Sequence, residues 1–336
     1  MSVKSKVTSL GLLRGIAVLA VCFCHFGLPL SNSGMLSNLF AVFHDYGKYG
    51  VHVFFVISGF IIPFSLYKAK FELRDYFLFL YKRFLRLHPP YLVGLLFTLV
   101  LAAASYHSKH IPNPENIVSI LKSLFYIHAP ADNPVYWTLK VEAEYYLFIG
   151  LFFVLMTKFP KLSLLVGIPI LAVLSQTPLA NYISLFSFIA FFMIGTVGYL
   201  IYVKEGNALY EYVLLFLLIV FISIFYEVPA TIVSSLTILC ILFYRKTLPD
   251  IVEFPGEISY SLYLLHFPLG VKFINVAQRF ISPSYNVLIF IAALVVCIIA
   301  AYVFWQFIEK PFARLSNNVK YGNAKTTFKN YSLKPD

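Results

Sequence analysis

The sequence predicts an all-α integral membrane protein with about ten transmembrane helices and both termini in the cytoplasm. Of its 336 residues, 60% are hydrophobic and only 12% are charged, and the mean hydropathy is +0.81. A water-soluble domain of this size could not bury so much apolar surface. The apolar residues also fall into runs of about 17 to 25 residues, which is the length that crosses a bilayer.

Ten apolar runs are candidates for membrane spans, and the lysines and arginines between them indicate the orientation. The expected spans are, in chain order, residues 8–30, 47–67, 87–106, 136–156, 162–178, 182–203, 208–226, 228–244, 258–279 and 285–308. With the N-terminus inside, nineteen of the 26 lysines and arginines fall on the cytoplasmic side, four fall outside and three lie within spans. Because cytoplasmic loops retain positive charge, this split predicts cytoplasmic termini and an external loop at 107–135.

The chain is predicted to form one membrane domain, residues 1–315, followed by a short basic cytoplasmic tail, residues 316–336, which we expect to be mobile. The net charge of +11 does not indicate a nucleic-acid partner, because the charges lie in short clusters between apolar runs and not on one basic face. Such clusters suit contact with membrane lipids. The four cysteines all lie in apolar runs, so neither a disulfide framework nor a metal site is expected.

The first span contains two ionisable residues, Arg14 and His25, and a charge within hydrocarbon is costly enough to make each a functional candidate. Eleven helical residues return to within about 20° of the starting direction and rise roughly 16 Å, so both side chains face the same way. A histidine can serve as a general base near neutral pH, and a buried arginine can hold an anion or a carbonyl dipole. The alternative is a helix-packing His25 and an Arg14 that extends to the interface.

Polar candidates also lie at both ends of the second span. Asp45 and His52 are near its outer end and could join a cluster with His25. In the inner loop that follows, Arg83 and Arg86 are spaced i,i+3. This spacing suits the binding of a polyphosphate, although positive charge there also anchors the topology.

The fourth span begins with three charges close together, Lys140, Glu142 and Glu144. They must face protein or water because lipid does not solvate them. Lys140 and Glu144 can neutralise each other as an i,i+4 pair, whereas Glu142 is expected about one to two turns deep, near the depth of His25. In the ninth span, hydroxyl groups precede His266, which either bonds between helices or lines a water-filled cavity.

Taken together, these residues resemble the membrane-bound acyltransferase type 3 family, which includes bacterial polysaccharide and lipopolysaccharide O-acetyltransferases. The resemblance runs from residue 8 to about 315. Its motifs are Arg14 with His25, Gly50-Val51 with Phe54 to Phe60, Arg83-x-x-Arg86 with Pro90-Tyr91, Trp137-Thr138-Leu139 with Glu142, Ser259 to His266, and Glu309-Lys310-Pro311. Thr138 replaces the serine common in the family's tryptophan motif and keeps its hydroxyl. Some members append an SGNH esterase-like domain, and here the stand-alone form is expected.

The resemblance implies a membrane O-acyltransferase of the bacterial inner membrane. It would move an acyl group, acetyl in the simplest case, from cytoplasmic acetyl-CoA to a hydroxyl of an envelope or exported glycan, or of a lipid-linked saccharide. In this hypothesis His25 is the general base, Glu142 or Asp45 orients it, and Arg14 positions the thioester or stabilises its oxyanion. Arg83 and Arg86 would bind the phosphates of coenzyme A.

A transporter or flippase of a lipid-linked saccharide is the main alternative, since it would also need many helices and a polar cavity. No inverted repeat and no matching pair of Gly/Pro-broken helices supports it. A purely structural membrane scaffold is disfavoured, because it would gain nothing from the desolvation cost of Arg14, His25 and Glu142.

Overall fold

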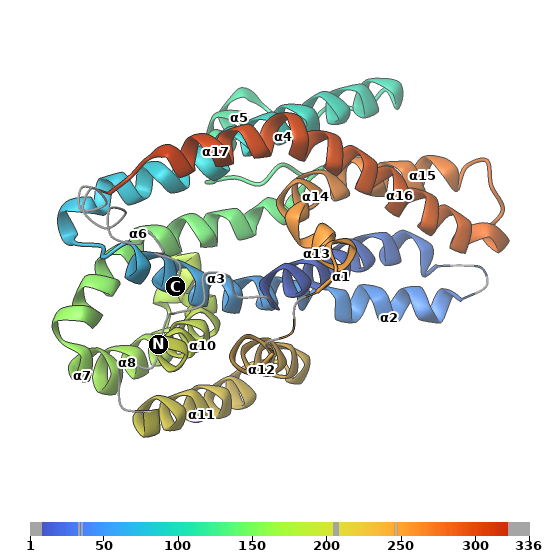
Figure 1. The fold of residues 1–336 in the computed structure, drawn as a ribbon. Coiled ribbons are helices and arrows are strands. Elements are labelled where there is room, and N and C mark those ends of the chain that lie inside the picture. The colour runs from blue at the N-terminus through green and yellow to red at the C-terminus, as the bar shows by residue number, and fades with distance from the viewer. Residues whose placement is uncertain are drawn as a thin grey trace, which may run out of the picture.

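The computed structural model describes residues 9–32, 34, 36–203, 208–244, 246 and 248–321, and over these residues the protein is a bundle of helices without strands (Figure 1). Within this described part, six helical stretches are long and apolar enough to cross a membrane. They are Ser9–Leu30, Ser37–Lys68, Leu73–Ser108, Ser184–Val203, Ala208–Phe225 and Pro283–Asn318. The all-α membrane class is confirmed, while the number of ten spans and the cytoplasmic termini stay predictions.

The first three helices pack closely. α1 (Ser9–Leu30) is followed by α2 (Ser37–Gly47), which lies beside it, and by α3 (Gly50–Lys68) (Figure 1). Gly50 allows α3 to approach α1, because a Cβ at this position would overlap the carbonyl oxygen of Ala17. Small residues commonly permit such contacts between membrane helices. The sequence analysis does not predict α2, which turns back along α1 before α3 begins.

α10 (Ser184–Val203) packs against α3 in the same way. A Cβ on Gly59 would overlap the backbone of Phe192, and Thr196 Oγ1 donates a hydrogen bond to the Gly59 carbonyl at 3.2 Å. Two further apolar helices, α11 (Ala208–Phe225) and α12 (Val228–Phe243), follow at the lower edge of the bundle in Figure 1. α3 is therefore held on both sides, by α1 and by α10.

α4 (Tyr76–Ser108) is long, and the segment after it folds back along it. The short helix α5 (Ile117–Leu124) lies beside α4 in Figure 1. Tyr126 reaches the first half of α4, where its hydroxyl is 3.0 Å from His88 Nδ1. The predicted loop 107–135 is thus a packed segment, which we call the fold-back segment.

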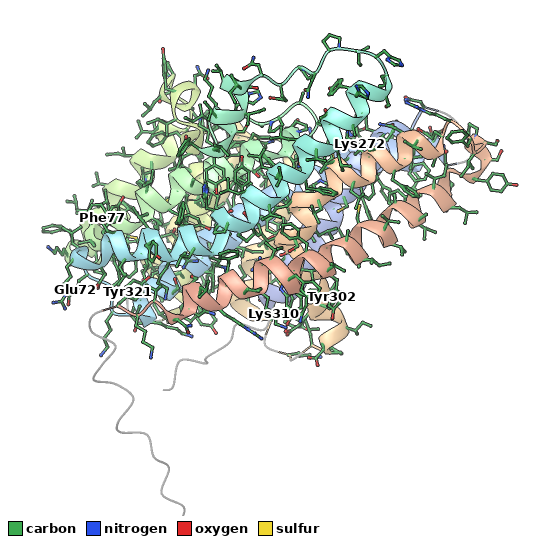
Figure 2. The ribbon with its side chains drawn as sticks, turned by 90° about the horizontal axis from the view of Figure 1, so that it is seen from above. Glu72, Phe77, Lys272, Tyr302, Lys310 and Tyr321 are labelled. Carbon is green, nitrogen blue, oxygen red and sulfur yellow. The ribbon has the colours of Figure 1, made fainter. Side chains whose placement is uncertain are left out.

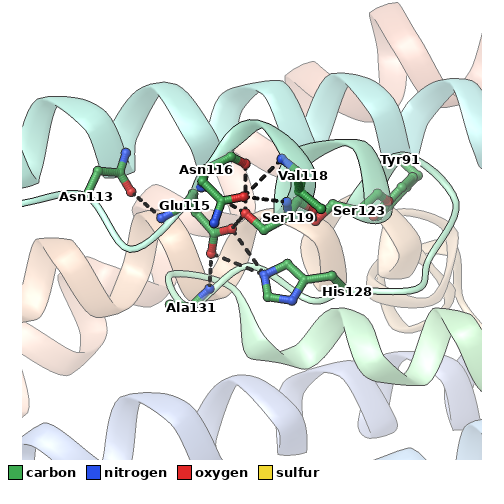
Figure 3. Close-up of polar contacts among 9 residues, drawn as sticks. All are labelled: Tyr91, Asn113, Glu115, Asn116, Val118, Ser119, Ser123, His128 and Ala131. Atoms are coloured by element: carbon green, nitrogen blue, oxygen red, sulfur yellow. Dashed lines mark hydrogen bonds and ion pairs between the residues drawn. The ribbon is translucent and has the colours of Figure 1, made fainter.

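A polar cluster around Glu115 closes the fold-back segment (Figure 3). Ser119 Oγ donates to Glu115 Oε2 at 2.7 Å and the Ala131 N–H donates to Oε1 at 2.9 Å, while His128 Nε2 lies 3.1 Å from Oε2. Asn116 caps α5 by accepting two backbone N–H groups. Burial works to raise the pKa of Glu115, but the hydrogen bonds from Ser119 and Ala131, together with His128, outweigh it and hold this pKa below its ordinary value.

α6 (Trp137–Lys158) contains the charged start of the fourth predicted span. Lys140 Nζ and Glu144 Oε1 are 3.8 Å apart, as their i,i+4 spacing predicts, and Glu144 Oε2 also accepts the Leu185 N–H at 2.6 Å. The span predicted at 162–178 is a shorter continuous helix, Pro160–Leu174. It consists of α7 (Pro160–Leu162), the π-helix η3 (Ser163–Gly167) and α8 (Ile168–Leu174), and the short helix α9 (Leu179–Tyr182) follows it.

The C-terminal third contains two interrupted helices. α14 (Ser259–Leu265) passes through the π-helix η4 (His266–Val271) into α15 (Lys272–Ala277), where one span was predicted at 258–279. The second interrupted helix consists of α16 (Asn286–Phe304), the π-helix η6 (Trp305–Glu309) and α17 (Lys310–Asn318). π-helical turns are rare and occur frequently at functional sites.

The remaining elements are short. They are α13 (Asp250–Glu257) and the 3-10 turns η1 (Leu73–Asp75), η2 (Pro134–Tyr136) and η5 (Pro283–Tyr285).

The beginning of the predicted tail packs onto α4. Ser316 Oγ donates to the Lys82 carbonyl at 2.8 Å, and Lys82 Nζ donates to the Val319 carbonyl at 2.8 Å. The expectation of a mobile tail is therefore wrong for residues 316–321. The rest of the tail lies outside the described residues. So do seven of the lysines and arginines that are predicted to be cytoplasmic, namely Lys4, Lys6, Lys204, Arg245, Lys325, Lys329 and Lys334.

The bundle has two ends, seen from above in Figure 2. Glu72, Phe77 and Tyr321 lie at one end, and Lys272 lies toward the other. We call the first the Arg83 end, because α4, the helix that contains Arg83, begins there. α3 and α6 both run toward the Arg83 end (Figure 1).

Candidate functional site

A cavity of about 150 Å³ lies inside the bundle, among α1, α3, α4, α6, α14 and η6. Five of its lining residues are ionisable side chains that are normally charged at neutral pH, namely Arg14, Arg83, Arg86, Glu142 and Glu309. Three arginines against two carboxylates leave an excess of positive charge. The cavity therefore favours an anion or a strongly polarised carbonyl group. We call it the arginine cavity.

Arg14 is held in this cavity by α14. Its Nε donates to Ser259 Oγ at 3.2 Å, and Ser259 Oγ in turn donates to the Gly256 carbonyl at 2.8 Å. This contact uses one of the five N–H donors of the guanidinium. The planar head is oriented by the protein and retains donors for a group bound in the cavity.

Glu309 forms another wall of the cavity and is only 8% exposed. It stands at the end of η6, where its Oε2 accepts the Ser261 N–H at 3.1 Å and the Ser261 hydroxyl at 2.6 Å. Two hydrogen bonds offset part of the cost of burying a carboxylate. Glu309 thereby ties the end of η6 to α14, the helix that also holds Arg14.

Arg83 and Glu142 meet at Tyr146. The Tyr146 hydroxyl donates to Glu142 Oε1, while the Arg83 guanidinium lies against the rings of Tyr146 and Phe79, at 5.6 Å and 5.5 Å from their centroids. Arg83 Nη2 donates to Ser65 Oγ at 3.1 Å. Its buried Nε has no hydrogen-bond partner within the described residues. An arginine fixed by aromatic rings, with a donor still unpaired, is suited to binding an anion.

A more apolar hollow of about 240 Å³ adjoins the arginine cavity between α4 and α6. Arg83, Glu142, Tyr146 and Tyr260 line both spaces. Phe84, which is 51% exposed, lies on the outer side of the hollow. The cavity therefore continues sideways into an apolar region at the surface of the bundle.

His25 does not line the arginine cavity. Its ring lies 5.3 Å from that of His266 and 5.1 Å from that of Phe267. His266 is fully buried, and its Nδ1 lies 2.8 Å from the Tyr263 carbonyl, which makes Nδ1 the protonated nitrogen. Its Nε2 is then an acceptor, and no described residue bonds to it. Tyr263 connects this pair to the cavity, because it lines the cavity and its ring lies 5.6 Å from that of His266.

The two predicted partners of His25 lie elsewhere. Asp45 is exposed on α2, and it is the preceding residue, His44, that faces α1 and contacts the Cys24 carbonyl through Nδ1 at 3.1 Å. Glu142 lines the cavity with Arg14. Within the described part of the chain, neither carboxylate has a hydrogen bond or ion pair to His25.

A known protein family matches the chain. A family model described as an acyltransferase domain, that of acyltransferase 3, matches residues 7–306, nearly the whole chain. The chain belongs to this acyltransferase family. Neither the curated proteins nor the solved structures gave a significant match. The resemblance stated from the motifs is thus confirmed, and the chain is a multi-pass membrane acyltransferase.

In this acyltransferase, three helices, α1, α4 and α6, bring together four residues that the sequence analysis singled out, Arg14, Arg83, Arg86 and Glu142. Their roles stay predictions. The sequence analysis gave no site role to Glu309, although it quoted this residue in the closing motif of the resemblance. It used Ser259 and Tyr260 only as parts of a motif and gave no role to Tyr146. Their place in the cavity depends on contacts between distant helices.

The cysteines and potential metal ligands contribute no further centre. All four cysteines are free; Cys22, Cys24 and Cys297 are buried, and Cys240 is half-buried. Among the described residues, no three His, Cys, Asp or Glu side chains are grouped so that they could hold a metal ion.

Proposed function

We propose that this acyltransferase moves an acyl group, acetyl in the simplest case, from cytoplasmic acyl-CoA to a hydroxyl of an envelope or exported glycan. The observation that carries the proposal is the arginine cavity within a membrane bundle. A coenzyme A thioester brings phosphate groups, and its carbonyl oxygen gains negative charge during transfer. Arginine suits both, through paired hydrogen bonds to phosphate and through stabilisation of the developing oxyanion.

The volume of the cavity suits only the reacting end of the donor. Sites that enclose a drug-sized ligand occupy about 300–1,000 Å³, and the arginine cavity measures about 150 Å³. The nucleotide part of acyl-CoA would therefore remain at the Arg83 end, where Arg83 and Arg86 can meet its phosphates. Arg14, which Ser259 holds in the cavity, would bind the thioester carbonyl. The predicted excess of positive charge on the cytoplasmic side supports this direction.

His25 is the proposed general base. The acceptor oxygen attacks the thioester carbon, a C–O bond forms, the C–S bond breaks, and coenzyme A leaves as a thiolate. The proton of the acceptor hydroxyl passes to His25. His266 Nε2 can accept the N–H of one His25 nitrogen, which would leave the other nitrogen unprotonated and ready for the proton. In this proposal His266 takes the orienting role that the sequence analysis gave to Glu142 or Asp45.

The test is transfer of labelled acetyl from acetyl-CoA to glycan in membranes that contain each variant. General-base catalysis contributes about 10²- to 10⁴-fold in rate, so His25→Ala should lose activity on this scale while inserting normally. His25→Gln should also fail, because an amide keeps a hydrogen bond but does not accept the proton. His110→Ala, at an exposed position after α4, is the matched control and should behave like the wild type.

Near wild-type transfer by His25→Ala, at equal expression, would reject His25 as the base. Another result would reject the reaction itself. If the wild-type protein transfers no label to any glycan but moves lipid-linked saccharide across vesicles, the transporter alternative replaces the acyltransferase proposal.

A further inference from the structure

We propose that a wide aromatic pocket beside Trp137 is the acceptor site and that it binds a neutral sugar ring. The inference rests on the proposed function, which requires a glycan acceptor. The pocket has a volume of about 600 Å³ and lies between the start of α3, the start of α6, α10 and the turn from α11 to α12. This volume is within the range of about 300–1,000 Å³ typical of small-molecule sites. We call it the acceptor pocket.

The walls of the acceptor pocket are aromatic. Trp137 and Phe188 line it with ring centroids 5.2 Å apart, and Tyr49 and Tyr226 also line it. Trp137 is 42% exposed, so part of its ring is open to a ligand. The face of an aromatic ring carries partial negative charge, on which the weakly positive C–H groups of a sugar ring can pack.

The rim of the pocket offers polar groups of both kinds. Lys48 Nζ lies 3.3 Å from Glu227 Oε2, and the Tyr49 hydroxyl donates to the same carboxylate at 2.5 Å. These contacts hold the pKa of Glu227 below its ordinary value, so the carboxylate is charged at neutral pH. An ammonium donates and a carboxylate accepts, which together match the hydroxyl groups of a sugar.

The same ion pair excludes other ligand classes. The charges of Lys48 and Glu227 cancel, and none of the other described residues that line the pocket carries a fixed charge. The pocket thus lacks the excess of positive charge that would attract a phosphate or a uronic acid, in contrast to the arginine cavity. A neutral hexose or an N-acetylhexosamine fits this balance best.

The acceptor pocket also adjoins the arginine cavity. Val51 lines both spaces, and Trp137 of the pocket is followed directly by Thr138 of the cavity. Phe55, which lines the cavity, contacts Phe188 of the pocket with ring centroids 5.0 Å apart. A sugar packed on Trp137 would therefore lie next to the arginine cavity, in which the thioester is proposed to bind, because the adjacent residue Thr138 lines that cavity.

Intrinsic fluorescence gives a direct test, because the chain has two tryptophans, Trp137 and Trp305. Trp305→Phe leaves Trp137 as the only tryptophan, and Trp137→Phe leaves Trp305 on η6 as the matched control. Each purified protein would be titrated with methyl glucoside, methyl galactoside, N-acetylglucosamine and glucuronate. We expect a saturable change with at least one neutral sugar in the Trp305→Phe protein, a weaker response to glucuronate, and no response in the Trp137→Phe protein.

Three results would overturn the proposal. One is the absence of a saturable response to any of these sugars in the Trp305→Phe protein. Another is an equal response in the Trp137→Phe control. The third is a response to dodecanol but not to sugars, which would make the pocket a site for a lipid chain.

Kinetics separate this proposal from the proposed function. Loss of an aromatic contact of about 0.5–1.5 kcal/mol corresponds to about twofold to tenfold, so Trp137→Ala should raise the KM for the acceptor by this factor and leave the KM for acyl-CoA unchanged. If transfer proceeds and the acceptor KM does not move, the acceptor pocket is rejected alone. If sugars bind at Trp137 but no acetyl is transferred, the proposed function is rejected and the sugar site stands.

Discussion

The arginine cavity and the acceptor pocket share a wall on α3 but differ in size, charge and openness. The cavity measures about 150 Å³ and contains three arginines and two carboxylates. The pocket measures about 600 Å³, and its walls are aromatic around one ion pair whose charges cancel. The charges that lipid cannot solvate are thus concentrated where the reaction is proposed to develop negative charge. Recognition of the acceptor would fall to uncharged rings at the surface.

The largest effect is expected from Arg14, because it would act on the transition state. Removal of a donor that stabilises an oxyanion typically costs about 10²- to 10³-fold in rate, so Arg14→Ala should reduce acetyl transfer on this scale. Arg14→Lys keeps the charge but loses the fixed fork of donors, and should recover only part of the activity. Arg314→Ala, exposed on α17, serves as the control.

Sugar binding at Trp137 should be unaffected by Arg14→Ala when it is measured by fluorescence in the Trp305→Phe background. If the variant abolishes sugar binding as well as transfer, the two spaces do not act separately, and the contrast between them is lost.

A smaller effect on both spaces together is expected from Gly59→Ala. The added methyl group would overlap the Phe192 backbone and push α3 away from α10. Overpacking of this kind costs about 1–3 kcal/mol, so the thermal unfolding temperature should fall, and acyl-CoA and sugar binding should both weaken. Gly167→Ala is the matched control, since the nearest atom to its Cβ would be 3.5 Å away. Equal unfolding temperatures for the two variants would contradict the proposed packing.

The smallest effect concerns the fold-back segment, which contributes to neither the arginine cavity nor the acceptor pocket. Because the pKa of Glu115 is lowered in the folded protein, its stabilising contribution is present above the unfolded value of about 4.3 and is lost as the pH falls through the folded value. Glu115→Gln should therefore speed proteolysis of residues 109–133 at pH 7 but not under strongly acidic conditions. An equal difference between wild type and variant at both pH values would contradict this role for the carboxylate.

The sequence was informative where a charge interrupts an apolar run. Arg14 and Glu142 stand out in this way, and the structure places them in one cavity. Glu309 does not stand out, because a charge at the end of the last span is ordinary at a membrane interface. Only the packing of η6 against α14 shows that this carboxylate is buried and bonded to Ser261.

Other features depend on contacts that no local pattern contains. Helix geometry predicts that Arg14 and His25 face the same way, but it cannot show that the cavity reaches only Arg14. The fold-back segment depends on the contact of Tyr126 with His88, which lies far back along the chain. The interruption of the ninth predicted span at His266 likewise becomes visible only in the backbone.

The placement of the cysteines allows the orientation of the protein in the membrane to be measured by thiol labelling. A thiol reacts as the thiolate, and thiols buried in apolar surroundings are inert; of the four native thiols three are buried and the fourth, Cys240, is half-buried in α12. A membrane-impermeant maleimide should therefore label the native chain weakly. A cysteine introduced at Lys109 or at Arg314, both exposed, would be modified only from the side of the membrane that it faces. The orientation can thus be determined in intact cells without first removing the native thiols.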